Sequence, residues 1–262
     1  MSSFKTELYP EAESRHSKSS EKYLKAKRAI RNEWISGFSG AFLALFICGH
    51  LILESSILFG KEAYQATVHL LEVTIPIAKP VVIFVTIVFF IHFVWASRKI
   101  PGKLEDRKRM MGLGKIIKGS KKLWNQNKKL ETSLSAHFET SLWIWQVRTG
   151  MIVLATGAFH LILVIWNMFT DMGVIGQETG LSAEIATARV ESGLWILYTV
   201  LMFAVVAHMA IGVYRLLVKW LADTWFVRKY SKILFYFLFW FFTILGIATI
   251  IGLAGPWEGI LS

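Results

Sequence analysis

The chain has 262 residues, of which 54% are hydrophobic and only 18% are charged, and its formal net charge is +11. Soluble domains carry about 25% charged residues, so this balance excludes an ordinary water-soluble domain. It indicates an integral membrane protein whose basic surplus must be explained by where the charges lie.

Five apolar runs follow one another along the chain, each with the ~20 residues that a helix needs to cross a ~30 Å hydrocarbon core. They are residues 35–59, 75–96, 142–167, 194–218 and 233–253. The runs show no strand alternation, and open sheet edges cannot be satisfied in lipid. The sequence therefore predicts an all-α fold, with a bundle of five transmembrane helices within residues 35–255.

The segments between and around these runs differ in charge. Lys and Arg gather in residues 1–34, in the link 98–139 and in residues 215–232, whereas the other connections and the tail 256–262 carry few. By the positive-inside rule, the N-terminus is cytoplasmic and the C-terminus periplasmic. The basic surplus is then a topology signal, and we expect no nucleic-acid partner. The link 98–139 is either a solvated segment or a surface that docks a soluble partner or anionic headgroups of the lipid bilayer.

The first 34 residues mix acids, bases and serines without an apolar core, so they predict a cytoplasmic surface helix and not a cleavable signal peptide. The single cysteine, Cys48, lies inside the first run. One thiol excludes a self-contained iron–sulfur cluster and an internal disulfide.

Four of the seven histidines lie inside four different apolar runs: His50, His92, His160 and His208. His50 is sixteen residues past Trp34, roughly 24 Å at ~1.5 Å per residue, which places it in the outer half. His92 and His208 lie six and seven residues before a basic residue, roughly 10 Å from the cytoplasmic edge. His160 is deeper than these two. Depth therefore pairs His50 with His160 and His92 with His208.

Two imidazoles at one depth on separate helices suit the two axial positions of a haem, and such a haem serves electron transfer. Without a CxxCH motif, we expect two non-covalent haems b. A single membrane histidine can instead be a hydrogen-bonding group between helices, and four can form the proton relay of a haem-free transporter. Lys219, Arg215 and Arg148 either meet haem propionates or extend to the lipid headgroups.

Two stretches carry a family resemblance: residues 206–220 (VAHMAIGVYRLLVKW) and residues 142–150 (LWIWQVRTG), which lead to His160. They resemble the dihaem cytochrome b subunit of bacterial fumarate reductases and succinate:quinone oxidoreductases, and the likeness spans nearly the whole chain. It implies a protein of the bacterial inner membrane with haem ligands on its first four helices. His92 and His208 would hold the haem nearer the cytoplasm. The implied partners are a flavoprotein with covalent FAD and an iron–sulfur subunit, with menaquinone as the favoured quinone.

The resemblance also suggests roles for single residues. Trp143 and Lys219 are expected near a haem propionate, with Ser36 a further candidate on the first helix. Glu72 matches the family's acidic residue for quinol oxidation by its distance past His50, and Glu54 is a less specific alternative. The sequence departs from menaquinol-oxidising members at Val206, where they carry a proton-conducting glutamate.

A second function stays open at this point. Dihaem cytochrome b subunits of formate dehydrogenases and hydrogenases also use four membrane histidines. The residues from Tyr214 to Trp220 argue for the fumarate reductase type.

Overall fold

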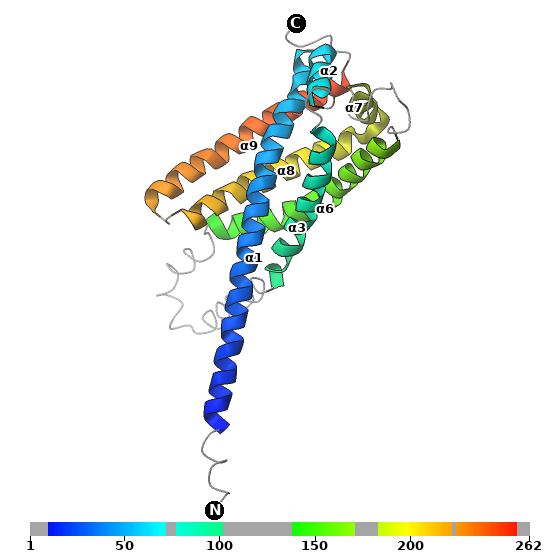
Figure 1. Ribbon diagram of the computed structural model, residues 1–262. Helices are drawn as coiled ribbons and strands as arrows, with labels where there is room; N and C mark the ends of the chain where they lie inside the picture. The colour runs from blue at the N-terminus through cyan, green and yellow to red at the C-terminus, as the bar shows by residue number, and fades with distance from the viewer. Residues whose placement is uncertain (1–9, 72–76, 102–137, 171–182, 222–223, 256–262) are drawn as a thin grey trace, which may run out of the picture.

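The computed structural model describes residues 10–71, 77–101, 138–170, 183–221 and 224–255. Within these ranges the chain is helical, with no strand, and five helices are long and apolar enough to cross a membrane. The long helices are α1 (Pro10–Glu54), α3 (Ala78–Ser97), α6 (Phe138–Thr170), α8 (Trp195–Trp220) and α9 (Trp225–Ala254). The short ones are η1 (Ser55–Phe59), α2 (Lys61–His69), α7 (Ala183–Arg189) and η4 (Val190–Leu194). The predicted all-α fold with five spans is confirmed (Figure 1).

The N-terminal segment is continuous with the first membrane span. Helix α1 runs for 45 residues without a break and projects beyond the rest of the bundle (Figure 1). No proline follows Pro10 until residue 76, so nothing interrupts the backbone hydrogen bonds where the composition changes near residue 34. The predicted separate surface helix over 1–34 is therefore, from Pro10 onward, the extension of a membrane helix. The link 98–139 lies almost wholly outside the described residues, as does the tail 256–262.

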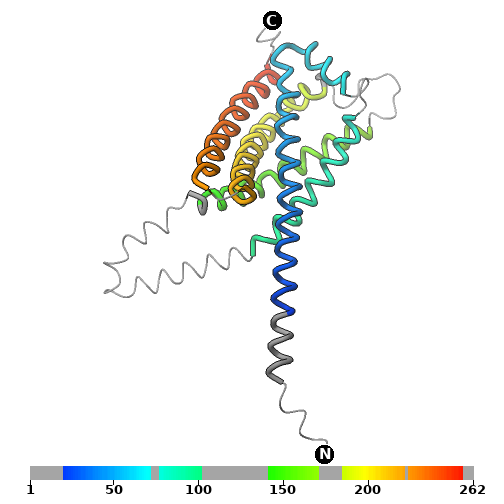
Figure 2. Tube along the Cα trace, turned by 60° about the vertical axis from the view of Figure 1, so that its left-hand side comes forward, coloured from blue at the N-terminus to red at the C-terminus, as the bar shows by residue number. Residues whose placement is uncertain are grey.

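Four of the long helices form a closed ring. Helix α1 packs against α3, α3 against α6, α6 against α8, and α8 against α1. Helix α9 packs outside this ring, mainly on α8, and α8 lies between α9 and α6 in both views (Figures 1 and 2). Helices α1 and α6 are thus opposite each other across the ring, and so are α3 and α8.

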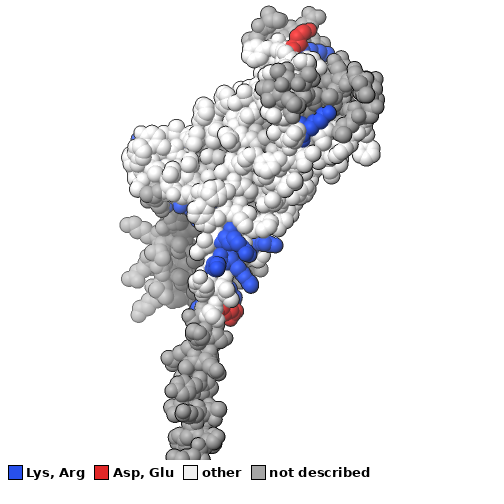
Figure 3. Space-filling model, in the orientation of Figure 1, with Lys and Arg blue, Asp and Glu red and all other residues white. Residues whose placement is uncertain are grey.

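The outer surface of the bundle is apolar. Large side chains such as Phe84, Ile87 and Ile162 are exposed on the outside of their helices. Figure 3 shows a broad band without charged side chains on one face, with Lys and Arg gathered at its lower edge. An apolar band of this size is the surface that contacts lipid. Polar hydroxyls inside it are satisfied locally, because Ser39, Thr86 and Thr149 each donate to the carbonyl four residues earlier at 2.7 Å.

The short helices close the end of the bundle opposite to the one where α1 projects (Figure 1). This end is called the α2 end below. Gly60 (φ +108°) turns the chain from η1 into α2, and Gly193 (φ +96°) bends it between α7 and α8. Both conformations lie in the region that favours glycine. The turns let Tyr64 pack with Ile57, Val190 and Leu253 in a small buried cluster.

Candidate functional site

The four membrane histidines lie on the four helices of the ring, and they face one another across its diagonals. His50 of α1 is opposite His160 of α6, with ring centroids 6.5 Å apart. His92 of α3 is opposite His208 of α8, with ring centroids 6.3 Å apart. The structure therefore brings together the same two pairs that depth along the sequence predicts. Their role as haem ligands stays a prediction.

These spacings fit a metal atom between the two rings of each pair. A metal–imidazole bond is about 2 Å long, and the ring centroid lies about 1.1 Å beyond the bonding nitrogen, so two axial imidazoles have centroids about 6.3 Å apart. The donor set also suits iron in a haem, for which histidine is a common axial ligand.

The second ring nitrogens of His92 and His208 have neutral acceptors. Nδ1 of His92 lies 3.1 Å from the Ser39 hydroxyl, which itself donates to a carbonyl of α1. Nδ1 of His208 lies 3.0 Å from the carbonyl of Gln146 and 3.3 Å from the Thr149 hydroxyl, which likewise donates within its own helix. The available acceptors place a proton on Nδ1 of both rings. Each Nε2 then keeps its lone pair for a metal.

Two glycines give these imidazoles their room. A Cβ atom on Gly40 would lie 2.9 Å from Cε1 of His92, and one on Gly150 would lie 2.9 Å from Cε1 of His208. A side chain at either glycine would therefore displace the imidazole ring next to it. The structure therefore has two equivalent hydroxyl–glycine pairs, Ser39–Gly40 on α1 and Thr149–Gly150 on α6. In each pair the hydroxyl contacts an imidazole of the neighbouring helix and the glycine leaves space for it. Sequence reasoning missed them, although the repeated hydroxyl–glycine pattern was a usable signal.

His50 and His160, nearer the α2 end, have different surroundings. His50 stacks on Phe46 with ring centroids 5.5 Å apart, and its Nδ1 lies 3.8 Å from Oε1 of Glu54. His160 meets Tyr198 edge-on, with ring centroids 5.6 Å apart. Its Nδ1 is buried without a hydrogen-bond partner. An unpaired buried nitrogen is costly, so this ring is not explained as a simple polar link between helices.

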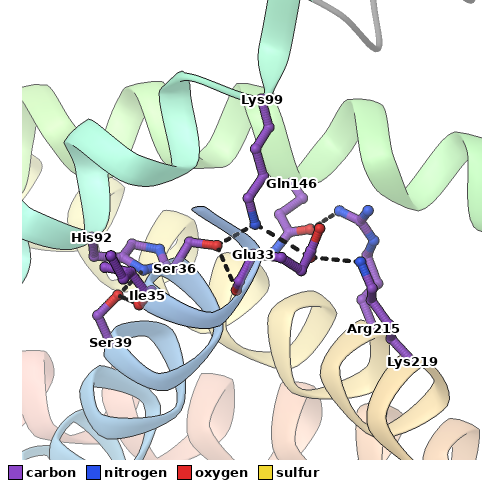
Figure 4. A network of polar contacts seen from close by, with 9 residues as sticks. All are labelled: Glu33, Ile35, Ser36, Ser39, His92, Lys99, Gln146, Arg215 and Lys219. Carbon is purple, nitrogen blue, oxygen red and sulfur yellow. Dashed lines mark hydrogen bonds and ion pairs between the residues drawn. The ribbon is translucent and has the colours of Figure 1, made fainter. Parts of the chain in front are cut away.

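A group of charged residues lies near His92 (Figure 4), and its Arg215 also lies near His208. We call it the basic cluster; it consists of Glu33, Lys99, Arg215 and Lys219. Glu33 pairs with Lys99 at 3.2 Å and with Lys219 at 2.7 Å. Ser36 accepts a hydrogen bond from Lys99, and Gln146 accepts one from Arg215. The cluster holds three cations and one carboxylate, so it is positively charged overall.

The structure places the predicted propionate residues as follows. Lys219 belongs to the basic cluster and Ser36 contacts it through Lys99. Trp143 is half-buried on α6, one turn before Gln146. Glu33 and Lys99 were not singled out from the sequence, because only the packing of α1, α3 and α8 brings them to Lys219.

Two further predicted positions have different outcomes. Glu72 lies outside the described residues, so its role stays a prediction. Val206 is 0% exposed and packs with Met202, Met209 and Phe242 in an apolar cluster where α8 meets α9. This position holds no proton-carrying group.

Comparison with known proteins identifies the family, although no family model matches the chain. It is 30% identical over 203 residues to the fumarate reductase cytochrome b subunit of Wolinella succinogenes, a match that covers 75% of this chain and 69% of that one. It is 29% identical over 195 residues to the subunits of the same name from two Helicobacter pylori strains, covering 72% of this chain and 66% of theirs.

The chain belongs to the fumarate reductase cytochrome b subunit family. The resemblance carried by residues 142–150 and 206–220 is thereby confirmed. The predicted location is confirmed as well: this family member is a multi-pass protein of the bacterial inner membrane. The formate dehydrogenase or hydrogenase alternative is not favoured by the relatives found.

The basic cluster generates a prediction about stability. Glu33→Gln leaves Lys99 and Lys219 close together without their common carboxylate, so the detergent-solubilised protein should lose about 1 kcal/mol of stability, the upper end for partly exposed ion pairs. The midpoint of thermal unfolding should fall at low salt, and the difference should shrink at about 1 M salt, where the screening length is only about 3 Å.

Glu21→Gln is the matched control, because Glu21 pairs with Lys25 on the same helix in full contact with solvent. An equal effect of the two substitutions would show that Glu33 does not hold the helices together.

Proposed function

We propose that this chain is the electron-carrying membrane anchor of a fumarate reductase or succinate dehydrogenase complex. It would hold two haems b, one between His50 and His160 and one between His92 and His208, and connect a membrane quinone with a partner in the cytoplasm. The observation that carries this proposal is the metal-compatible spacing of both histidine pairs, 6.5 and 6.3 Å between ring centroids.

A haem b supplies a one-electron couple, and with two histidine ligands it has no open position for oxygen or substrate. The chain's own residues would set up this closed site. The Ser39 hydroxyl and the Gln146 carbonyl would accept the Nδ1 protons of His92 and His208. Each Nε2 would then be oriented toward the centre of the four-helix ring. The apolar clusters around α8 exclude water.

The basic cluster would face the cytoplasm and hold the propionates of the haem near His92 and His208. Its positive charge suits two anionic propionates, and Lys219, Lys99 and Arg215 would supply the donors. Ser36 and Trp143 are the further candidates for this role. Glu33 would then balance the third cation.

The partners follow from the family and from the proposed orientation. A flavoprotein with FAD would interconvert fumarate and succinate, and an iron–sulfur subunit would dock at the cytoplasmic side, to which the charge pattern assigns residues 1–34 and the link 98–139. This chain would carry electrons and leave the dicarboxylate chemistry to the flavoprotein. Menaquinol in the bilayer would be the donor for fumarate reduction.

Purification of the native complex tests this function directly. We expect a flavoprotein and an iron–sulfur protein to co-purify with the chain, and the complex to couple quinol oxidation to fumarate reduction. A preparation with a formate dehydrogenase or hydrogenase partner would refute the proposal.

The histidine pairs predict two distinct low-spin haem components per chain. His92→Ala and His208→Ala should each remove one component of the reduced-minus-oxidised spectrum, and His50→Ala and His160→Ala should remove the other. Replacing the exposed histidine His69 with Ala is the control and should leave both. Loss of one component in both His50→Ala and His92→Ala would contradict the pairing.

Glu72 is proposed to accept a proton from quinol on the periplasmic side. Glu72→Gln should abolish quinol-coupled turnover, because an amide cannot take up the proton. Both haems and electron transfer from artificial donors to fumarate should be retained. Normal quinol activity in this variant would remove Glu72 from the mechanism.

Val206 predicts that turnover is electrogenic. The side chains packed around it are apolar, so no proton follows the electrons inward at this position. Each uncompensated electron then crosses the membrane potential at about 2.3 kcal/mol per 100 mV. In proteoliposomes, menaquinol oxidation by fumarate should build a potential that is negative on the cytoplasmic side, as read by a voltage-sensitive dye. Rapid fumarate reduction without a dye response, in ion-tight vesicles, would show that a proton path exists elsewhere.

A further inference from the structure

The four predicted ligands differ in what their second ring nitrogen meets. His92 and His208 face a hydroxyl and a carbonyl, which are neutral. Nδ1 of His160 has no hydrogen-bond partner. Among the described residues, a carboxylate faces only one of the four: Nδ1 of His50 lies 3.8 Å from Oε1 of Glu54, one helical turn further along α1.

Glu54 is fixed from its other side. The hydroxyl of Tyr64 donates to Oε2 of Glu54 at 2.9 Å. Tyr64 is itself only 5% exposed, because it packs with Ile57, Val190 and Leu253 under helix α2. The two carboxylate oxygens thus have separate roles, with Oε2 anchored by Tyr64 and Oε1 directed at His50. The turn at Gly60 makes this possible by bringing α2 back over the end of α1.

A carboxylate partner changes the ligand's chemistry. A metal-bound histidine usually donates its other ring N–H to an acceptor, and an anionic acceptor increases the electron donation of the ring to the metal. Greater donation and a nearby negative charge both favour the oxidised, more positive iron, which lowers its reduction potential.

The charged residues near His50 and His160 differ from those near His92 and His208. Arg189 lies on the His160 side, where it is close to Asn167 and Tyr198. Among the described residues, Glu54 thus lies beside His50 and Arg189 beside His160. The basic cluster presents three cations and one acid to the other pair.

We propose that Glu54 is a positioning residue that orients His50 and lowers the reduction potential of the haem held between His50 and His160. The proposal rests on the proposed function, because it requires a haem at this pair. Its consequence is that the two haems differ in potential through residues of this chain.

A potentiometric titration of the purified complex tests the proposal. Glu54→Gln should raise the midpoint potential of the component that His50→Ala removes and leave the other component unchanged. Glu62→Gln is the matched control, because it removes the same charge from an exposed position on α2 at the same end. It should change neither potential. Unchanged potentials in Glu54→Gln, or an equal rise in both components, would overturn the proposal.

A second variant covers the case in which Glu54→Gln does not retain this haem. Tyr64→Phe keeps the carboxylate but removes its anchor, so the low-spin EPR signal of the same component should shift while the other stays fixed. An unaltered signal overturns the proposal. The two levels of failure are distinguishable: a complex without two haems refutes the proposed function, whereas two haems with unmoved potentials and signals refute only the role of Glu54.

Discussion

The closed ring of α1, α3, α6 and α8 is the constraint on which the rest of the structure depends. Backbone groups in lipid must be satisfied within each helix, so side chains alone make the contacts between helices. In a ring of four, each helix packs against two neighbours and faces the fourth across the centre. Side chains directed to the centre therefore meet in diagonal pairs. Two pairs of imidazoles occupy these diagonals at two levels, with almost the same spacing.

Neighbouring helices supply what the diagonal pairs need. Helix α1 seats the imidazole of α3 with Ser39 and Gly40, and α6 seats that of α8 with Thr149 and Gly150. A small residue allows the ring to approach, and the adjacent hydroxyl fixes its tautomer. The same side chains thus serve helix packing and ring orientation. Nδ1 of His92 and of His208 has a hydrogen-bond partner, whereas Nδ1 of His160 has none.

Charge divides the two levels further. The basic cluster gathers at the end of α3 and α8, where lysine and arginine can reach water. The α2 end instead has the Glu54–Tyr64 pair and Arg189, which the turns at Gly60 and Gly193 bring over the helix ends. Under the proposed function, these differences would give the two haem sites different affinities for an electron, because the field at each site sets that affinity.

The sequence by itself determined the five spans, the four candidate histidines and their partition into two depths. These are properties of position along a helix, and apolar run length and rise per residue measure them directly. Residues 142–150 and 206–220 also indicated the family. The tertiary structure alone decided the second partners: Ser39 with His92, Glu54 with Tyr64, and Glu33 with Lys99 and Lys219. Those contacts depend on how each helix is rotated about its axis and on which helix lies beside it. The length of an apolar run reveals neither, because it gives only the position of a residue along the helix axis.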